Sequence, residues 1–541
     1  MKIMHGRGVS DGIVHGKVVY YRPDGVGITR YTAEEEAEKN RFRKAQEDSI
    51  RQLKELAEKA RAESGEETAM LFEIHGMLVE DPEFTERVCM ILKQEHCNAE
   101  YAVQMAGEQN AARLEQLEDA YLQERAADIR DVTMRILENL TGQRQRCVRL
   151  SEPAIVAAED LTPSETLQLD RSKVLAFVTR QGSENSHAAI LARSMGIPAV
   201  CGMQELSEEI VGQEVWLDGT AGMLITDADE ETERTCLKKE QEQLEHRRLL
   251  QQMKGRRVQL ADGTWMRLYA NISAPEDVEA VLENDGEGIG LFRSEFLYLA
   301  SEQEPSEETQ FEAYRRVLEG MEGKEVIIRT LDLGADKRVP YFALDVEENP
   351  AMGMRAIRIC LERPELFRTQ LRALYRASAY GKLSILFPMI ASVWELQECR
   401  RLCECVRQEL RAEGIPFAEQ VPLGAMIETP AAVWCAEELA KEADFFSVGT
   451  NDLTQYTLAC DRQSGKLDRF FDPHHPAVLR ELECAAAAAK KAKIPIGICG
   501  ELAGDESLLP FFVKIGISEL SVAPKKILSL REVLTKQVVC R

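Results

Sequence analysis

Residues 422–453 read PLGAMIETPAAVWCAEELAKEADFFSVGTNDL, and this stretch decides the fold. Two short apolar runs, at 422–429 and 444–453, are separated by a segment of helical character. Apolar runs of this length, bounded by turn residues, are typical of buried strands. A strand, a helix and a second strand in succession predict a β/α unit whose two strands lie parallel.

The same alternation of strand and helix continues through the C-terminal part of the chain. Six further strand candidates lie at residues 267–272, 288–296, 326–334, 384–390, 494–501 and 519–524. Eight strands with intervening helices predict a (β/α)8 barrel over residues 256–541, whose active site would lie at the C-terminal ends of the strands.

Polar residues gather at these predicted strand ends. They are Asn271, Arg293, Arg329, Asp332, Glu428, Asn451, Asp452, Cys499 and Glu501. A random scatter of polar residues would not coincide with strand ends so consistently. The placement therefore predicts an enzyme.

Several arginines offer guanidinium groups suited to bidentate binding of phosphate or carboxylate. Arg355 and Arg462 are among them, although any one arginine could instead form a surface or interdomain ion pair. Arg293 and Arg329 are the better candidates because each lies within or just after an apolar strand. Burying a guanidinium there without an anion would be costly.

Glu428 and Asp452 supply two carboxylates on neighbouring strands. Together with substrate oxygens and waters, they would complete an octahedral Mg²⁺ shell. The alternative, ion pairs between these carboxylates and the arginines, is less favoured because both lie at adjacent strand ends. The inferred substrate is a small, doubly anionic phosphoester bound through Mg²⁺ and arginine.

Cys499 lies in GICGE at the end of a predicted strand. A cysteine by itself is more often packed in a core, but a thiol exposed in a cleft can transfer a proton. The flanking glycines and the position at the strand end favour the functional interpretation.

The N-terminal half is organised differently. Residues 1–30 and 146–226 read as short strands and turns, and they predict one compact α/β domain divided by a helical insertion over 31–145. The insertion is either a structural bundle or a docking platform for a partner protein. Residues 227–255 are highly charged with little apolar face, which is typical of a linker helix.

His187 has a distinctive setting, in GSENSHAAILARSMGIPAV. It follows a turn and opens a predicted helix, where free backbone N–H groups and the helix dipole favour an anion. A single histidine is usually a core or surface residue. Covalent phosphoryl transfer to this imidazole nevertheless fits its position.

Composition limits the possible partners. The 541 residues include 67 Lys and Arg against 92 Asp and Glu, a net charge of −25. This excess argues against a broad nucleic-acid surface, although it permits a small anionic ligand. The sequence shows neither an N-terminal apolar leader nor a run long enough to span a membrane, so we expect a cytoplasmic protein without membrane insertion.

The chain resembles the enzyme I family of the bacterial phosphoenolpyruvate:sugar phosphotransferase system along essentially its whole length. The motifs that carry the resemblance are SHAAILARSMGIPAV, GIGLFRSEFLY, ENPAMGMRAIR, ASAYGKLSILFPMI, ETPAA, DFFSVGTNDLTQYTLACDR and GICGELAGD. The resemblance implies a phosphohistidine domain with a helical insertion, a linker helix and a barrel that also forms a homodimer.

The resemblance also implies a role for each site residue. His187 would take the phosphoryl group from phosphoenolpyruvate and pass it to a histidine of the small carrier HPr, which docks on the helical insertion. Cys499 would protonate the enolate to give pyruvate. The implied substrate-binding residues are Arg293, Arg329, Arg355, Asn451, Asp452 and Arg462, and the implied Mg²⁺ ligands are Glu428 and Asp452.

The segment before His187 departs from the family pattern. The family usually has Gly-Gly-(Arg or Lys)-Thr-Ser, whereas residues 182–186 read GSENS and place Glu184 where a cation is usual. A carboxylate there would repel a phosphohistidine. A specialised or regulatory paralogue with altered transfer is therefore an alternative. A phosphoenolpyruvate synthase or dikinase is less favoured because the sequence offers no segment suited to an ATP-binding domain.

Overall fold

The structure is a computed structural model. It describes the chain except residues 22–27, 65, 116–119, 143–149, 151, 162–168, 170, 183–185, 261–262, 264, 300, 302, 335–338, 343–346, 348, 463–466, 468 and 540–541. The chain divides into two compact units, Met1–Arg247 and Arg248–Arg541.

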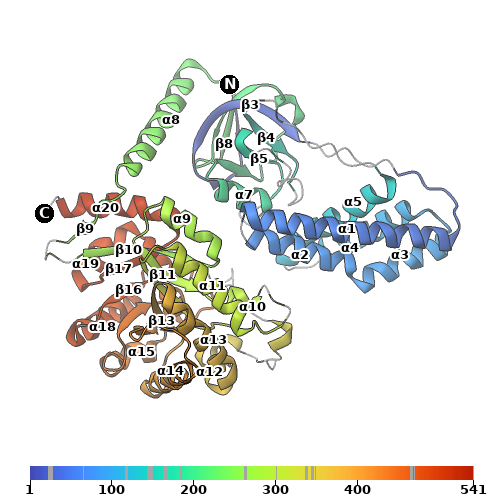
Figure 1. The fold of residues 1–541 in the computed structure, drawn as a ribbon. Coiled ribbons are helices and arrows are strands. Elements are labelled where there is room, and N and C mark those ends of the chain that lie inside the picture. The colour runs from blue at the N-terminus through green and yellow to red at the C-terminus, as the bar shows by residue number, and fades with distance from the viewer. Residues whose placement is uncertain are drawn as a thin grey trace. The chain divides into compact units, whose positions relative to one another are not determined.

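The second unit contains the predicted barrel (Figure 1). Its parallel strands are β10 (Trp265–Ile272), β11 (Gly288–Arg293), β12 (Glu325–Arg329), β13 (Lys382–Phe387), β14 (Leu423–Ile427), β15 (Phe445–Val448), β16 (Ile496–Ile498) and β17 (Glu519–Val522). Each strand pairs with the next, and β10 also pairs with β17, so the sheet closes. The two-residue strand β9 (Val258–Gln259) pairs antiparallel with the start of β10. The structure confirms the (β/α)8 fold.

Several predicted strands were too long at their C-terminal ends. The run 444–453 contains only a four-residue strand, because α17 (Thr450–Leu458) begins two residues after β15. The run 288–296 likewise ends its strand at Arg293, and α10 (Phe296–Leu299) follows. The polar residues at these ends therefore lie in turns and helix starts above the barrel.

Helices surround the barrel. They are α9 (Val278–Glu283), α11 (Glu307–Gly320), α12 (Ile357–Glu362), α13 (Pro364–Ala377), α14 (Val393–Glu413), α15 (Pro430–Trp434), α16 (Ala436–Leu439), α18 (Pro476–Ala492), α19 (Leu509–Ile515) and α20 (Ile527–Val539). The largest apolar cluster in the unit packs these helices against the outer face of the strands. A smaller buried cluster includes Leu291, Ile327, Leu386, Met426 and Cys499.

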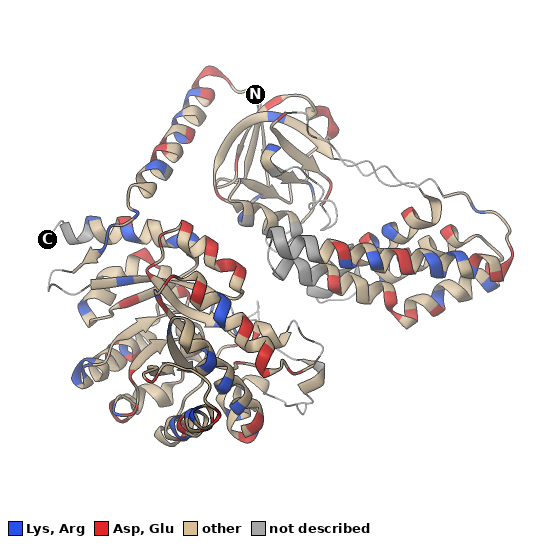
Figure 2. Ribbon diagram, viewed as in Figure 1, with Lys and Arg blue, Asp and Glu red and all other residues tan. Residues whose placement is uncertain are grey.

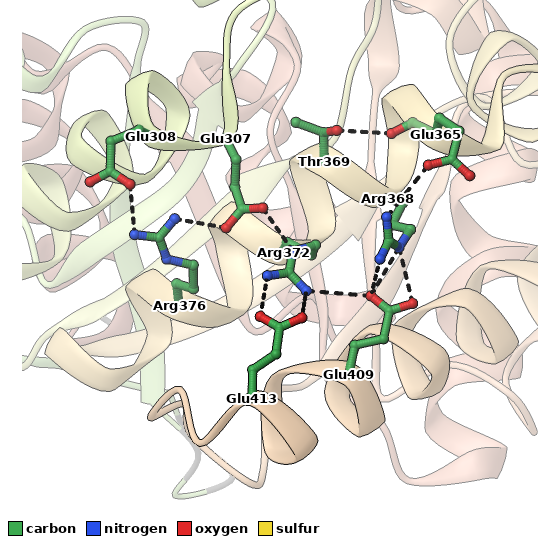
Figure 3. A network of polar contacts seen from close by, with 9 residues as sticks. All are labelled: Glu307, Glu308, Glu365, Arg368, Thr369, Arg372, Arg376, Glu409 and Glu413. Carbon is green, nitrogen blue, oxygen red and sulfur yellow. Dashed lines mark hydrogen bonds and ion pairs between the residues drawn. The ribbon is translucent and has the colours of Figure 1, made fainter.

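Ion pairs join three of the outer helices (Figure 3). Three arginines one turn apart on α13 point toward glutamates of α11 and α14. Arg372 is the central one, 2.7 Å from Glu307 on α11 and 2.7 Å from Glu413 on α14. Charged residues of both signs alternate over these helices, whereas most of the ribbon of the strands is uncharged (Figure 2).

The first unit contains an eight-stranded mixed sheet in the order β1-β8-β7-β3-β4-β5-β6-β2. Its strands are β1 (Lys2–His5), β2 (Arg7–Ser10), β3 (Ile13–Tyr21), β4 (Ala154–Ala158), β5 (Val174–Thr179), β6 (Ala199–Cys201), β7 (Glu214–Asp218) and β8 (Met223–Thr226). β3 pairs parallel with β4, which follows the helical insertion in the chain. One α/β domain is thus built from both sides of the insertion, as predicted.

The insertion comprises α1 (Glu35–Ser64), α2 (Glu66–Glu80), α3 (Pro82–Glu95), α4 (Ala99–Glu115) and α5 (Ala120–Thr141), packed around their own apolar core. The fully buried His75 of α2 lies in this core, with Nε2 3.1 Å from Asp128 and Nδ1 3.2 Å from Asp131, both on α5. No local pattern in the sequence indicates these two carboxylate partners.

The predicted linker helix is α8 (Glu230–Gln251). Its middle part contacts the sheet of the first unit, where Lys239 Nζ lies 2.9 Å from Asp218 and Gln243 accepts a hydrogen bond from the Ile13 N–H. In the described part of the chain, no helix is both long enough and apolar enough to cross a membrane.

Candidate functional site

The polar residues predicted at the strand ends line two cavities at that end of the barrel. One has a volume of about 750 Å³ and the other about 210 Å³. Both are lined by Arg293, Asn451, Cys499, Gly500 and Glu501. The smaller cavity is also lined by Arg329, Asp332, Asp452 and Arg462. The structure thus brings most of the predicted site residues together.

Two of the predicted arginines are buried and matched by carboxylates. Arg329 forms ion pairs with Glu295, which follows β11, and with Asp332 at 3.0 Å. Arg355 lies 2.9 Å from Asp332 and 3.2 Å from Asp452. Asp332 therefore joins the two guanidinium groups and fixes their positions.

Arg293 and Arg462 are more available to a ligand. Arg293 ends β11, lines both cavities and forms no ion pair with the residues that the structure describes. Arg462 approaches a carboxylate only loosely, at 3.6 Å from Asp452. A guanidinium in a cavity without a protein carboxylate is suited to an anionic ligand.

Glu428 follows β14 and is completely buried. Its Oε1 accepts a hydrogen bond from the Met389 N–H at 2.5 Å, whereas its Oε2 has no hydrogen-bond partner among the described residues. Burial, reinforced by repulsion from Asp452 and Asp332, raises the pKa of this carboxyl well above its usual range. A cation beside Oε2 would stabilise the buried negative charge and would reduce its repulsion from the neighbouring carboxylates.

The donor set fits Mg²⁺, a hard cation that takes oxygen ligands and is held by one or two carboxylates with substrate phosphate. No group of three or more His, Cys, Asp or Glu able to hold a metal occurs among the described residues, so Glu428 and Asp452 would need substrate oxygens to complete the shell. Gly449 belongs to this site, because a Cβ there would lie 2.6 Å from Glu428 Oε2.

Asp452 shows the alternative interpretation from the sequence, in which the carboxylates form ion pairs with the arginines. Its carboxylate is ion-paired with Arg355 and Arg462, whereas Glu428 forms no ion pair in the part of the chain that the structure describes. The pairing with arginine therefore applies to one of the two carboxylates only.

Cys499 follows β16 and is buried at the floor of both cavities. Its Sγ lies 3.6 Å from the Val448 carbonyl, to which it donates. Burial raises the pKa of the thiol to about 11, against the opposing influence of Ser447 and Arg329. The group therefore stays protonated at neutral pH and can act as a proton donor.

Asn451 is held by Glu501 at the mouth of the site. Its Nδ2 donates to Glu501 Oε1 at 3.1 Å, and its Oδ1 accepts from the Glu501 N–H at 3.0 Å. Asn271 instead ties strand ends together, donating to the carbonyls of Cys499 and Ser521. Of these three polar residues, Asn271 has the structural role.

Sequence reasoning missed two partners of the buried arginines. Glu295 pairs with Arg329, and the Tyr456 hydroxyl accepts a hydrogen bond from Arg355 at 3.0 Å. Glu295 lies two residues after Arg293, in the turn that follows an apolar strand. That position is the signal that could have identified it.

His187 is the first residue of α7 (His187–Met195), as predicted. Ser186 precedes it with an extended backbone, and the helix ends at Gly196, which has φ 69°. The buried face formed by Ala188, Ala189 and Ala192 packs in the core beside the sheet. Glu184 and its neighbours Ser183 and Asn185 lie outside the described residues, so the hypothesis about the altered turn stays a prediction.

Comparison with known proteins agrees with this geometry. Residues 247–539 match the family "PEP-utilising enzyme, PEP-binding domain", residues 5–125 the N-terminal family of these enzymes and residues 150–222 their mobile domain. The chain is 43% identical over 535 residues to the phosphoenolpyruvate-protein phosphotransferase of Priestia megaterium, covering 98% of this chain and 93% of that protein. The chain belongs to the enzyme I family.

A second phosphoenolpyruvate-protein phosphotransferase agrees with the assignment. The phosphoenolpyruvate-protein phosphotransferase of Bacillus subtilis (strain 168) is 41% identical over 541 residues, covering 99% of this chain and 95% of that protein. An NMR solution structure of an enzyme I protein (nEIt) is 40% identical, with a TM-score of 0.37, and covers 44% of this chain and 98% of its own. Membership in the enzyme I family confirms the predicted enzyme class, a phosphotransferase that uses phosphoenolpyruvate.

Proposed function

We propose that this enzyme I transfers the phosphoryl group of phosphoenolpyruvate to His187 and then to a histidine of an HPr-like carrier protein, releasing pyruvate. This transfer is the first step of sugar uptake by the phosphotransferase system. The observation that carries the proposal is the smaller cavity, where Arg293, which forms no ion pair with a described residue, lines the same space as Cys499 and Asp452.

In this proposal the arginines hold the substrate's negative charges. Arg293 and Arg462 are the guanidinium groups with the fewest protein partners, and Arg329 and Arg355 form the buried positive wall behind them. Asn451, fixed by Glu501, adds an amide that can bind a substrate oxygen. Prearranged donors of this kind orient the substrate and stabilise charge as it develops.

Glu428 and Asp452 would hold Mg²⁺. The bound cation would withdraw negative charge from the phosphoryl and enol oxygens. Neighbouring groups hold both carboxylates in position for the cation, because Arg355 pairs with Asp452 and the Met389 N–H donates to Glu428.

The bonds formed and broken balance in each of the two proposed steps. A ring nitrogen of His187 forms a bond to phosphorus while the bond from phosphorus to the enol oxygen breaks, leaving the enolate of pyruvate. Cys499 then donates its thiol proton to the terminal carbon of the enolate, giving pyruvate and a thiolate that solvent reprotonates. The raised pKa of Cys499 keeps that proton in place until an enolate forms.

The remaining parts of the chain receive roles by the same proposal. Residues 1–30 with 146–226 form the phosphohistidine domain, 31–145 the docking insertion for the carrier, 227–255 the linker and 256–541 the phosphoenolpyruvate-binding domain, through which two copies associate. The protein acts in the cytoplasm, and the cysteines among the described residues are free thiols, as suits a reducing compartment.

The test is incubation with phosphoenolpyruvate labelled with ³²P in the presence of Mg²⁺. The intact chain should acquire acid-labile label that an HPr-like carrier removes, and His187→Ala should acquire none. His246→Ala, which changes an exposed histidine of α8, is the matched control and should be labelled like the intact chain. Absence of label on the intact chain, or equal labelling of His187→Ala, would refute the proposal.

A further inference from the structure

A further cavity, of about 550 Å³, lies at the opposite pole of the barrel, where the strands begin. Its walls come from the start of β10, the turns before β11 and β12, helix α20 and the segment 255–257 that follows α8. The strand starts and the strand ends lie at opposite poles of a (β/α)8 barrel, so this cavity is separate from the phosphoenolpyruvate site.

The cavity is unusually basic for this protein. Its lining includes five cationic residues and two acidic ones, whereas the chain as a whole carries a net charge of −25. A concentration of cations around a hollow favours an anion only where the cations are not already matched by carboxylates. Whether this cavity favours an anion therefore depends on which of its five cationic residues already form ion pairs with carboxylates.

Arg531 of α20 is matched. It is 1% exposed and pairs with Asp285 and, at 3.4 Å, with Glu287. It also donates to the backbone carbonyl of Asp285 at 2.8 Å. This arginine forms ion pairs with both acidic residues of the cavity lining and has a structural role, although Glu287 also interacts electrostatically with Arg257.

Arg267 of β10 is matched as well. Its guanidinium lies 3.2 Å from Glu325 and 3.3 Å from Glu519, two carboxylates next to the cavity wall. It also lies over the ring of Tyr269, 5.3 Å from the centroid. Arg267 therefore contributes no surplus positive charge to the cavity.

The three remaining cations are Arg256, Arg257 and Lys324. None of them forms an ion pair with a described residue, and Lys324 Nζ has a hydrogen bond to the Gly286 carbonyl at 2.9 Å. Three cations that form no ion pair with a described carboxylate thus face one hollow, and Arg257 is close enough to Glu287 to act on it electrostatically. Two are guanidinium groups, which bind phosphate oxygens in a bidentate manner.

Trp265 adds an aromatic surface. Its side chain is 48% exposed at the start of β10 and lines the same cavity. An exposed indole beside unpaired cations offers a flat face against which a planar ring can stack, while the cations bind attached phosphates. The cavity volume is much larger than inorganic phosphate needs and suits a ligand that has both a planar ring and phosphate groups.

We propose that this cavity binds a phosphorylated small molecule with a planar ring, of the nucleotide class, through Arg256, Arg257, Lys324 and Trp265. The ligand's phosphates contact the three cations, and its ring lies against the indole. Because Arg256 and Arg257 lie between the end of α8 and the start of β9, bound ligand also fixes the point where the chain enters the barrel.

The test is calorimetric titration of the full-length chain with ATP, pyrophosphate and citrate, in buffer with EDTA and without Mg²⁺. ATP should bind saturably, and pyrophosphate more weakly because it lacks the ring. Arg256→Gln/Arg257→Gln should weaken ATP binding by about tenfold or more. Trp265→Ala should weaken ATP binding and leave pyrophosphate binding unchanged.

Two controls distinguish binding in this cavity from binding in the phosphoenolpyruvate site and from a general loss of positive charge. Arg293→Gln, in the phosphoenolpyruvate site, and Arg401→Gln/Arg411→Gln, two exposed arginines of α14, should both retain wild-type affinity for ATP. ATP should also slow tryptic cleavage after Arg256 and Arg257, measured by mass spectrometry. The proposal is wrong if ATP does not bind, if either control loses binding as Arg256→Gln/Arg257→Gln does, or if citrate binds more tightly than pyrophosphate.

Discussion

The guanidinium of Arg355 lies 3.2 Å from the carboxylate of Asp452, the residue that we propose as a ligand of Mg²⁺. Arg355 is 4% exposed and is also held by Asp332 at 2.9 Å, so it enters the site from a fixed position. The pair links the arginines that we propose bind the substrate to the carboxylates that we propose bind Mg²⁺. A change at either residue should therefore affect both functions.

Replacing Arg355 with methionine should destabilise the barrel. The change leaves two buried carboxylates, Asp332 and Asp452, without their shared cation, and the loss of one partner of a buried ion pair costs about 3–5 kcal/mol. Urea unfolding followed by circular dichroism measures the effect. Arg401→Met, which removes an exposed pair with Glu398, should change the free energy of unfolding far less. Equal losses in the free energy of unfolding for the two variants would show that the burial of Arg355 does not determine the loss.

Replacing Glu428 with glutamine should weaken Mg²⁺ binding by at least about tenfold, because the change removes a charged ligand from the shell. Calorimetry in the presence of phosphoenolpyruvate measures the affinity, in a His187→Ala background that prevents turnover. Asp505→Asn is the matched control: its carboxylate lines the larger cavity but is paired with His474. Undiminished Mg²⁺ affinity in Glu428→Gln would remove this residue from the metal site.

Gly449 provides a second approach to the same site. A Cβ at this position would lie 2.6 Å from Glu428 Oε2 and 2.7 Å from the Met426 methyl carbon. Gly449→Ala should therefore displace the carboxylate and lower Mg²⁺ affinity in the same calorimetric assay. Gly414→Ala is an informative comparison, since a Cβ there meets nothing within 4 Å but φ is 71°. It should cost stability and leave Mg²⁺ affinity unchanged. If Gly449→Ala kept its Mg²⁺ affinity while Gly414→Ala lost it, a clash between the new Cβ and Glu428 could not be the cause.

The barrel could be predicted because each strand is a short apolar run and several of these runs are followed by polar residues of the candidate site. The ends of the runs were less predictable. Phe445–Val448 and the following Asn451 belong to one continuous pattern in the sequence, yet the backbone leaves the sheet at Gly449 and α17 begins at Thr450. Where a strand ends depends on where its neighbours stop pairing, which the local sequence does not contain.

The candidate site was predictable in its members and less so in their pairing. Arg293, Glu428 and Cys499 are each identified by their place at the end of a strand. One carboxylate partner of Arg329, by contrast, is Glu295, which follows a different strand. His75 and Asp128 are 53 residues apart, and only the packing of α2 against α5 brings them together. Such pairs follow from tertiary packing, which periodicity does not encode.

The buried His75 should make the stability of the helical insertion depend on pH. Burial by itself lowers its pKa, but contacts with Asp128 and Asp131 more than compensate and raise the pKa from 6.5 to about 9. A histidine whose folded pKa is raised contributes stability that is complete below the unfolded pKa and is lost as pH rises through the folded pKa. The affected window is therefore about pH 6.5–9, and the loss is on the order of 3 kcal/mol.

Thermal unfolding of the intact chain between pH 6 and pH 10 tests this expectation. The transition of the helical insertion should fall in temperature across the window, and His75→Gln should lower the transition at pH 6 and flatten its pH dependence. His246→Gln, at an exposed position of α8, should behave like the intact chain. A pH dependence that His75→Gln leaves intact would assign the effect to another group.

Cys499 should resist alkylation at neutral pH and still be required for turnover. Its pKa of about 11 and its burial leave almost no thiolate at pH 7, so iodoacetamide should modify the exposed Cys484 far faster, as measured by mass spectrometry of tryptic peptides. Cys499→Ala should lower the rate of pyruvate formation by about 10²–10⁴-fold, the usual contribution of a positioned proton donor. Cys484→Ala should leave that rate unchanged. Because protonation follows the break between phosphorus and the enol oxygen, Cys499→Ala should still transfer some label to His187, whereas a wild-type rate of pyruvate formation would exclude Cys499 as the donor.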